Sequence, residues 1–464
     1  MANPTRKSIS NQIIRYKKYL ESDPVMKLNS ILGSETFLTI IEQCREYRER
    51  IFTPFITLMV FITQVLDPDK SCKKALTGFI GIRMGNGQKP CSANTGPYCK
   101  ARQKIPESTI KKLVDVSGKE AKHRTPLSWK WKGRDVNVVD GTTLLAPDTL
   151  TNVAAYPKHK NHAEGVGLPI MRLLVIFSLA TGVVLEYAMD TLRGEGTGEP
   201  SLLKRVMNNV MTTGDILLGD CGFHSFFLLI DLMEMGCDGL FQAHPYWKFD
   251  YRKGKKLAEK DYIVRWRKPK RRPPLMDPDT YRNYPKFLLI RVFTVGRHAY
   301  ITTMFDNKKY HKNELGELYR FRWQAELHLG SIKTIMGMDR LSCKTPEMVR
   351  KEIGVHLLAY NIIRIIMAEA STSHGVRPMQ ISFKGAVQFV NSFMPALNIL
   401  DKETRMEMYK YMLWSISNGR VGNRPGRKEP RAIKQRPKQF PLLKKHRNEY
   451  RKDLYNPKQI KAAA

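Results

Sequence analysis

Hydrophobic and polar positions change their rhythm near residue 125. Before that point, apolar residues recur at helical spacing over residues 9–21, 36–66 and 107–122, a pattern that predicts amphipathic helices. The longest apolar run, FITLMVFITQVL at residues 55–66, is too short to span a bilayer and indicates a buried helix. We therefore expect a helical region over residues 1–125 and no membrane partner.

From residue 134 onward the pattern is that of strands separated by helices. The runs DVNVVDGTT and MRLLVIFSLATGVVLEYAMDT predict three strands, of which the last two form a hairpin around residues 180–182. A helix over residues 198–211, a strand over 215–220, a helix over 224–236 and a strand over 237–244 follow. This alternation predicts a mixed α/β layer.

In the second half of the chain, the alternation of strands and helices is interrupted and then resumes. Residues 247–285 are polar, basic and rich in proline, and the runs FLLIRVFTV and HAYITTMF that follow them read as strands. A helix is then expected over residues 312–337, and a long apolar helix over 346–370. Residues 420–453 hold 13 lysines and arginines against 3 acids, which indicates an extended basic arm.

Charge narrows the range of partners. The chain holds 78 lysines and arginines against 43 acids, a formal charge of +35, and an excess of this size favours a nucleic acid as partner over a merely soluble basic protein. The seven cysteines are scattered without a CxxC pair, which predicts neither a disulfide framework nor a zinc site. We expect a protein of the reducing cytoplasm.

Two acids end predicted strands. Asp140 closes one strand and Asp220 another, and the ends of strands are where an α/β sheet displays functional groups. Each acid also has an ordinary interpretation, because aspartate followed by a turn glycine is a common turn residue. Neither acid alone identifies a site.

The segment YRFRWQAELHLGSIK, residues 319–333, has an unusual distribution of charge. On a continuous helix, with about 100° per residue, one face would carry a carboxylate amid phosphate-seeking groups, within about 60° of arc: Tyr319, Arg322, Glu326 and Lys333. The alternative is an amphipathic surface helix in which Glu326 forms an ion pair with Arg322.

Together the three acids indicate a metal site. Asp140, Asp220 and Glu326 could surround two divalent ions, an arrangement that can cleave phosphodiester bonds. Their hard oxygen ligands suit Mg²⁺ or Mn²⁺.

Three blocks of the chain resemble one known family. VVDGTTLLAPDT around Asp140, LLGDCGFHSF around Asp220 and RWQAELHLGSIKTIMGMDRL around Glu326 are similar to the acidic blocks of bacterial insertion-sequence transposases of the D-D-E type. The resemblance covers roughly residues 131–370. The basic segment RKEPRAIKQRPKQFPLL at residues 427–443 also resembles the tails of this family.

The spacing of the third block resembles the Y-R-E-K signature of one group, the insertion sequence four family, without departure. The resemblance implies that Asp140, Asp220 and Glu326 are catalytic and bind the metal. It also implies that three residues hold phosphates of the transposon end: Tyr319, Arg322 and Lys333. Arginine binds phosphate as a fork and lysine as a point charge, which fits these roles.

The resemblance also implies a domain organisation. A ribonuclease H-like catalytic core would span residues 126–244 and 306–375, interrupted by a β-rich insertion over residues 245–305. We expect this insertion on one side of the core, outside its central sheet. Residues 1–125 would form a helical DNA-binding region, and residues 376–464 a C-terminal helical region with the basic tail.

Trp266, within the predicted insertion, has two interpretations. Some members of the family open DNA through a terminal hairpin with a flipped base, and Trp266 could stack on such a base. Packing in a small core of the insertion is the more common role of a tryptophan.

These observations predict a bacterial DNA transposase that cuts out and inserts an insertion sequence. It would act in the cytoplasm on nucleoid DNA and pair two transposon ends, as at least a dimer on double-stranded DNA. Two alternatives stay open: a nuclease of the same fold that cuts without joining, and a non-catalytic DNA-binding regulator derived from a transposase.

Overall fold

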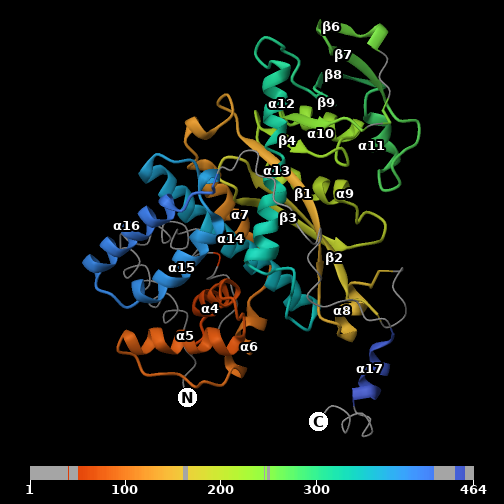
Figure 1. Ribbon diagram of the computed structural model, residues 1–464. Helices are drawn as coiled ribbons and strands as arrows, with labels where there is room; N and C mark the ends of the chain where they lie inside the picture. The colour runs from red at the N-terminus through yellow and green to blue at the C-terminus, as the bar shows by residue number, and fades with distance from the viewer. Residues whose placement is uncertain are drawn as a thin grey trace.

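The computed structural model describes residue 40 and residues 51–159, 166–244, 246–247, 251–422 and 445–454. The helix expected over residues 9–21 and the tail segment at residues 427–443 lie outside the described residues. In the described part of the chain, helices surround one mixed sheet of nine strands (Figure 1). The architecture is therefore the mixed α/β arrangement that the alternating pattern predicts.

The first five strands occupy one half of the sheet in the order β3-β2-β1-β4-β5. The strand β2 runs antiparallel to both β1 and β3, whereas β4 and β5 run parallel to β1. Gly182 takes a φ of +75° in the turn between β2 and β3, a conformation that suits glycine. The bounds are β1 (Val136–Leu145), β2 (Ile170–Ser178), β3 (Val184–Thr191), β4 (Ile216–Gly219) and β5 (Asp238–Gln242).

The segment at residues 255–302 extends the same sheet. It contains β6 (Lys255–Ala258), β7 (Asp261–Arg267), α11 (Pro278–Asn283), β8 (Phe287–Val295) and β9 (His298–Thr302). Because β9 pairs antiparallel with β5, these strands form the outer part of the central sheet. The expectation that they lie outside that sheet was wrong: β5 offers an open edge, and pairing with β9 satisfies its backbone groups.

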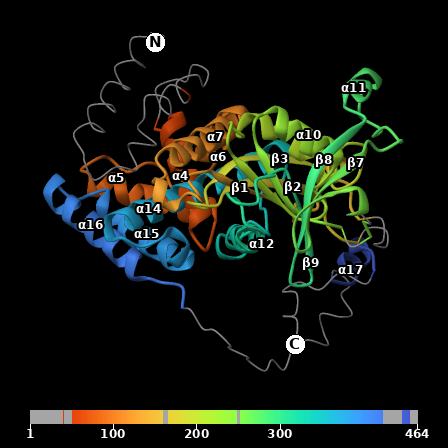
Figure 2. The ribbon, with the colours of Figure 1, turned by 90° about the horizontal axis from the view of Figure 1, so that it is seen from above.

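Helices cover both faces of the sheet. Consecutive residues of β1 point to opposite faces, so Val139 packs with α9 (Glu199–Val206) and α10 (Phe226–Glu234). Val138 belongs to the core that includes α13 (Trp323–Gly330) and α14 (Pro346–His374). Seen from above, α10 and α12 (Lys312–Arg320) lie on opposite sides of the sheet (Figure 2).

The long apolar helix α14 is at the centre of the core that includes Val138 and α13. It is long and apolar enough to cross a membrane, but 83% of its most apolar window is buried inside the protein. Both α4 (Pro54–Leu66) and α7 (Glu107–His123) pack against it. The helices α4 and α7 thus share a hydrophobic core with the later part of the chain. The other helices are α5 (Cys72–Gly85), α6 (Gly96–Lys104), α8 (Leu150–Ala155), α15 (Phe383–Leu397), α16 (Lys402–Asn418) and α17 (Arg447–Leu454).

The helix expected over residues 312–337 is broken into three parts. The expectation of one continuous helix was therefore wrong. After α12, the backbone N–H of Arg322 bonds to the carbonyl of Tyr319, and that of Ala325 to the carbonyl of Arg322. These i→i−3 bonds tighten the turn before α13. Residues 331–335 then form a π-helix, which is wider than an α-helix. The angular positions of the four signature residues therefore differ from those on a regular helix.

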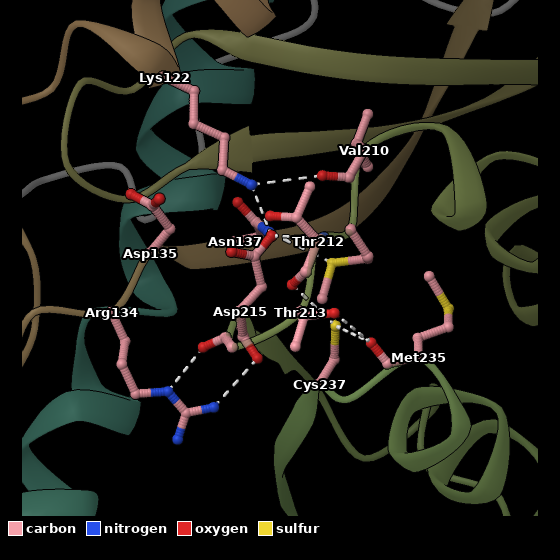
Figure 3. Close-up of polar contacts among 12 residues, drawn as sticks. Lys122, Arg134, Asp135, Asn137, Val210, Thr212, Thr213, Asp215, Met235 and Cys237 are labelled. Carbon is pink, nitrogen blue, oxygen red and sulfur yellow. Dashed lines mark hydrogen bonds and ion pairs between the residues drawn. The ribbon is translucent and has the colours of Figure 1, made fainter.

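A buried polar network lies at the starts of the parallel strands, away from the two candidate aspartates (Figure 3). The Asp215 carboxylate accepts hydrogen bonds from Lys122 Nζ at 2.5 Å and Asn137 Nδ2 at 3.1 Å. Arg134 donates to the Gly214 carbonyl at 2.6 Å and pairs with Asp238 at 2.6 Å. Because this network joins the starts of β1, β4 and β5, it holds the parallel strands in register.

Candidate active site

Asp140 and Asp220 lie at one edge of the parallel strands. The ladder between β1 and β4 ends at Val138 and Leu218, and Asp140 is two residues beyond it on β1. Asp220 directly follows β4. Because β1 and β4 are parallel, both aspartates lie beyond the carboxyl end of the ladder that the two strands share, where α/β sheets present functional groups. The expectation that Asp140 closes a strand was wrong, because β1 continues to Leu145 through its pairing with β2.

Burial governs the ionisation of Asp140. Loss of solvent raises the pKa of its carboxyl to about 6, and the nearby charges of Asp220 and Glu326 act in the same direction. The backbone N–H of Gly141, 2.9 Å from Oδ1, and the Arg322 guanidinium oppose the shift. The three acids thus lie within electrostatic reach of one another, in a place where negative charge is incompletely balanced.

The turn after β4 fixes the Asp220 side chain. Its Oδ1 accepts the backbone N–H of Gly222 at 2.7 Å. This contact leaves the second carboxylate oxygen free of that turn. The turn interpretation of Asp220 is therefore correct as a description of the local structure, and it is compatible with a role in the site.

Arg322 holds Glu326. Nη2 of Arg322 donates to Oε1 of Glu326 at 2.6 Å. Burial alone would lower the pKa of Arg322, but the hydrogen bond to Glu326 and the neighbouring Tyr319 raise it overall. The arginine is therefore firmly charged, and one oxygen of the candidate third acid is occupied by it.

Tyr319 lies at a basic hollow. Burial raises the pKa of its phenol, and its ring packs 5.0 Å from that of Tyr300. The hydroxyl lies near the backbone of Gln242 but has no well-formed hydrogen bond among the described residues. The hollow has a volume of about 450 Å³, and its lining includes Tyr319, Arg322, Arg297, His298, Arg320 and Trp323. Positive charge and an unsatisfied hydroxyl suit an anionic group there.

Lys333 binds the strand that carries Asp140. It lies in the π-helix, and its Nζ donates to Thr142 Oγ1 at 2.9 Å and to the Thr143 carbonyl at 3.1 Å. Lys333 is therefore docked on β1, just past Asp140. The structure brings Tyr319, Arg322 and Glu326 together, and Lys333 binds β1 two and three residues beyond Asp140.

The donor set fits a divalent cation by its chemistry. Three carboxylates supply hard oxygen ligands, and the raised pKa of Asp140 reflects charge that a cation would balance. Among the described residues, no three histidine, cysteine, aspartate or glutamate side chains lie close enough to hold an ion as they stand. The pairing of Glu326 with Arg322 is one reason, because it engages the third carboxylate.

Sequence reasoning missed a fourth acid near this edge. Glu199 begins α9. Burial raises the pKa of its carboxyl, the Arg172 guanidinium opposes this shift, and the charge of Asp220 adds to it. The residue follows a glycine-rich turn, GEGTG, and matches no motif, so only the fold reveals its position.

Trp266 packs against other aromatic side chains. Its ring lies 4.2 Å from that of Trp247 and 5.7 Å from that of Phe226. These contacts agree with a packing role.

Comparisons with known proteins agree with the geometry. The family model described as "Transposase DDE domain" matches residues 131–362. A relative from Escherichia coli, the transposase InsG for insertion sequence element IS4, is 27% identical over 77% of this chain and 80% of its own length. The transposase for insertion sequence element IS421, also from Escherichia coli, is 32% identical over 14% of this chain and 18% of its own length.

A solved structure of piggyBac transposase, in a synaptic complex with hairpin DNA, covers 87% of this chain and 86% of its own chain, at 11% identity and a TM-score of 0.41. The family model spans half of the chain and includes all three acids at the sheet edge. The chain therefore belongs to the DDE transposases, and it is a DNA transposase of the IS4 insertion-sequence family.

Proposed function

We propose that this transposase moves its insertion sequence by metal-dependent cut-and-paste chemistry. It would bind the terminal inverted repeats, hydrolyse a phosphodiester bond at each end and join the 3′-hydroxyls to target DNA. The observation that carries the proposal is that the charges of Asp220 and Glu326 act on Asp140, where burial raises the pKa of the carboxyl to about 6. A cluster that resists ionisation suits a site completed by cations.

DDE transposases use divalent metal ions. For this chain we propose Mg²⁺ or Mn²⁺, with two ions held by Asp140, Asp220 and Glu326, because carboxylates suit these hard cations. Bound there, the ions would supply activation of a water or a 3′-hydroxyl and stabilisation of the leaving oxygen.

The basic residues would bind the DNA end. Arg322 offers a planar fork and Tyr319 an unsatisfied hydroxyl beside the same hollow, so a phosphate that settles there would receive both. Lys333 would supply a point charge at β1, in exchange for its present contacts with Thr142 and Thr143. These groups would orient the scissile strand against the acids.

The strand order supports a ribonuclease H-like catalytic core over residues 126–244 and 306–375. In such a core three antiparallel strands are followed by strands parallel to the first, and β3-β2-β1-β4-β5 has this arrangement. Residues 245–305 would be the β-rich insertion that extends the sheet. Residues 1–125 would recognise the end sequence, and the tail within residues 376–464 would add non-specific attraction to DNA.

DNA is the substrate of this family of enzymes, and the charge of +35 suits it. We further propose that two copies assemble on paired transposon ends, because both ends must be joined to one target. The protein would act in the bacterial cytoplasm, on the nucleoid.

The test uses DNA carrying the terminal repeats of the insertion sequence that encodes the protein. With Mg²⁺, paired labelled ends and a target plasmid, the proposal predicts cleaved ends and joined products. Cleavage without joining would identify a nuclease instead. Binding to the ends without cleavage would identify a regulator.

A further inference from the structure

The strongest unassigned feature is Glu199, whose carboxylate lies against the residue that follows Asp140. A Cβ atom on Gly141 would be 2.3 Å from both Cδ and Oε1 of Glu199, far inside van der Waals contact. The absence of a side chain at residue 141 is therefore what lets this carboxylate approach β1.

Glu199 reaches the site from the opposite face of the sheet to Glu326. Successive residues of a strand point to opposite faces, so Gly141 faces α9 while Asp140 faces away from it. Beyond Val138 the ladder between β1 and β4 has ended, and no β4 residue pairs with β1 beside Asp140. The charge of Asp220 reaches Glu199 across this opening and contributes to its raised pKa.

The carboxylate of Glu199 forms one long ion pair among the described residues, with Arg172. Arg172 Nε lies 3.9 Å from Oε1, which is too far for a good hydrogen bond. Instead, Nη1 of Arg172 donates to the Thr197 carbonyl at 2.8 Å, and Nε of Arg172 has no hydrogen-bond partner among the described residues. The oxygens of Glu199 thus remain available to a cation.

We propose that Glu199 is a fourth carboxylate of the metal site, opposite Glu326, and that it binds a divalent ion directly or through a water ligand of the ion. The inference rests on the proposed function, because it assumes a metal between Asp140 and Asp220. The ordinary alternative is that Glu199 only stabilises the start of α9, where an acid interacts favourably with the helix dipole.

The test is Mn²⁺ binding, measured from the electron paramagnetic resonance signal of free Mn²⁺, to the full chain in complex with its own terminal-repeat DNA. Glu199→Gln should weaken Mn²⁺ binding about ten-fold. Glu195→Gln, an exposed acid in the same turn, is the matched control and should bind like the wild type. Gly141→Ala should also weaken binding, because the added methyl group displaces the Glu199 carboxylate.

Two further readouts separate the metal role from a structural one. Excess Mn²⁺ should restore cleavage to Glu199→Gln, and its melting temperature without metal should not fall. Equal Mn²⁺ affinity in Glu199→Gln and Glu195→Gln, or a lower melting temperature with unchanged Mn²⁺ affinity, would overturn the inference.

Asp140→Asn distinguishes failure of the fourth carboxylate from failure of the proposed metal site. If Asp140→Asn weakens Mn²⁺ binding and Glu199→Gln does not, only the fourth carboxylate fails. If the wild-type complex leaves all Mn²⁺ free, the proposed metal site fails, and this inference fails with it.

Discussion

Arg322 Nη2 lies 2.6 Å from Glu326 Oε1, so the arginine and the acid of the family signature are bound to each other. While this ion pair persists, one Glu326 oxygen is unavailable to a cation. A DNA phosphate that binds Arg322 competes with the carboxylate for the same guanidinium. We therefore expect binding of the transposon end to release Glu326 towards Asp140 and Asp220, so that DNA binding and metal binding assist each other.

Replacing Arg322 should separate these two effects. In Arg322→Ala, Glu326 is free without DNA, so the DNA-free protein should bind Mn²⁺ more tightly than the wild type. The same variant should bind transposon ends about ten-fold more weakly, the cost of one charged hydrogen bond, and its residual cleavage should be sensitive to salt. Titrations of Mn²⁺ and of labelled DNA measure both quantities.

The control for this variant is Arg124→Ala. Arg124 forms an i,i+4 pair with Glu120, also at 2.6 Å, at the end of α7. Its removal should leave the Mn²⁺ affinity unchanged. Equal behaviour of the two variants would mean that the pair of Arg322 and Glu326 is an ordinary helix-surface contact.

Substitutions of Lys333 and of Thr142 should lower cleavage to different extents. Lys333→Ala removes the charge beside β1, and we expect reduced cleavage with metal binding retained. Thr142→Val removes one hydrogen bond of Lys333 but leaves that to the Thr143 carbonyl, so cleavage should fall less than about five-fold, in line with one neutral hydrogen bond. A larger loss in Thr142→Val would indicate that the threonine itself contacts the reacting groups.

The ionisation of Asp140 predicts a dependence of stability on pH. The pKa of Asp140 is about 6 in the folded protein against an ordinary value of 3.8, so the folded state binds this proton more tightly than the unfolded state. The stability that the protonated form contributes is complete below pH about 4 and is lost as the pH rises through 6. In EDTA at pH 7.5, Asp140→Asn should be more stable than the wild type, by about 1–2 kcal/mol after allowance for solvent screening.

Chemical denaturation at pH 7.5 and pH 4 measures this difference. The gap between Asp140→Asn and the wild type should close at the lower pH, where the wild-type carboxyl is also neutral. A gap that is independent of pH would show that the effect does not come from titration of Asp140.

The tail should contribute affinity but no sequence discrimination. A deletion that begins at residue 423 removes α17 but spares Val421, whose backbone N–H bonds to the Gln380 carbonyl at 2.8 Å. Binding to end DNA and to random DNA should weaken together, and the salt dependence should flatten by about one unit for each lost phosphate contact. Gel shifts at several salt concentrations test this, and selective loss of end binding would reverse the assignment.

The strands of the first half of the sheet could be predicted because the pattern of their own side chains is typical of strands. The β-branched and apolar runs of β1 to β5 and the glycine in the β2–β3 turn are local features. That β9 pairs with β5 is not local, because pairing depends on which edge is open after folding. The packing of α7 on α14 likewise joins segments that are far apart in the sequence.

The sequence pointed to three candidate acids, but it could not predict how they are arranged. Strand ends and the family signature pointed to Asp140, Asp220 and Glu326. The tight turn at Arg322 contains no proline or glycine. Gly330 directly precedes the π-helix at Lys333, but a single glycine does not predict that helix. Glu199 was missed because its proximity to Gly141 arises from the packing of α9 on the sheet.

The central claim is that the three acids perform the chemistry, and cleavage of one labelled transposon end in Mg²⁺ tests it most directly. Asp140→Ala, Asp220→Ala and Glu326→Ala should each lower the rate of cleavage by at least about three orders of magnitude, while a gel shift shows that end binding persists and circular dichroism shows an intact fold. Glu317→Ala, which removes an exposed acid of α12, should cleave normally. A folded Glu326→Ala variant that cleaves its end at the wild-type rate would contradict the account.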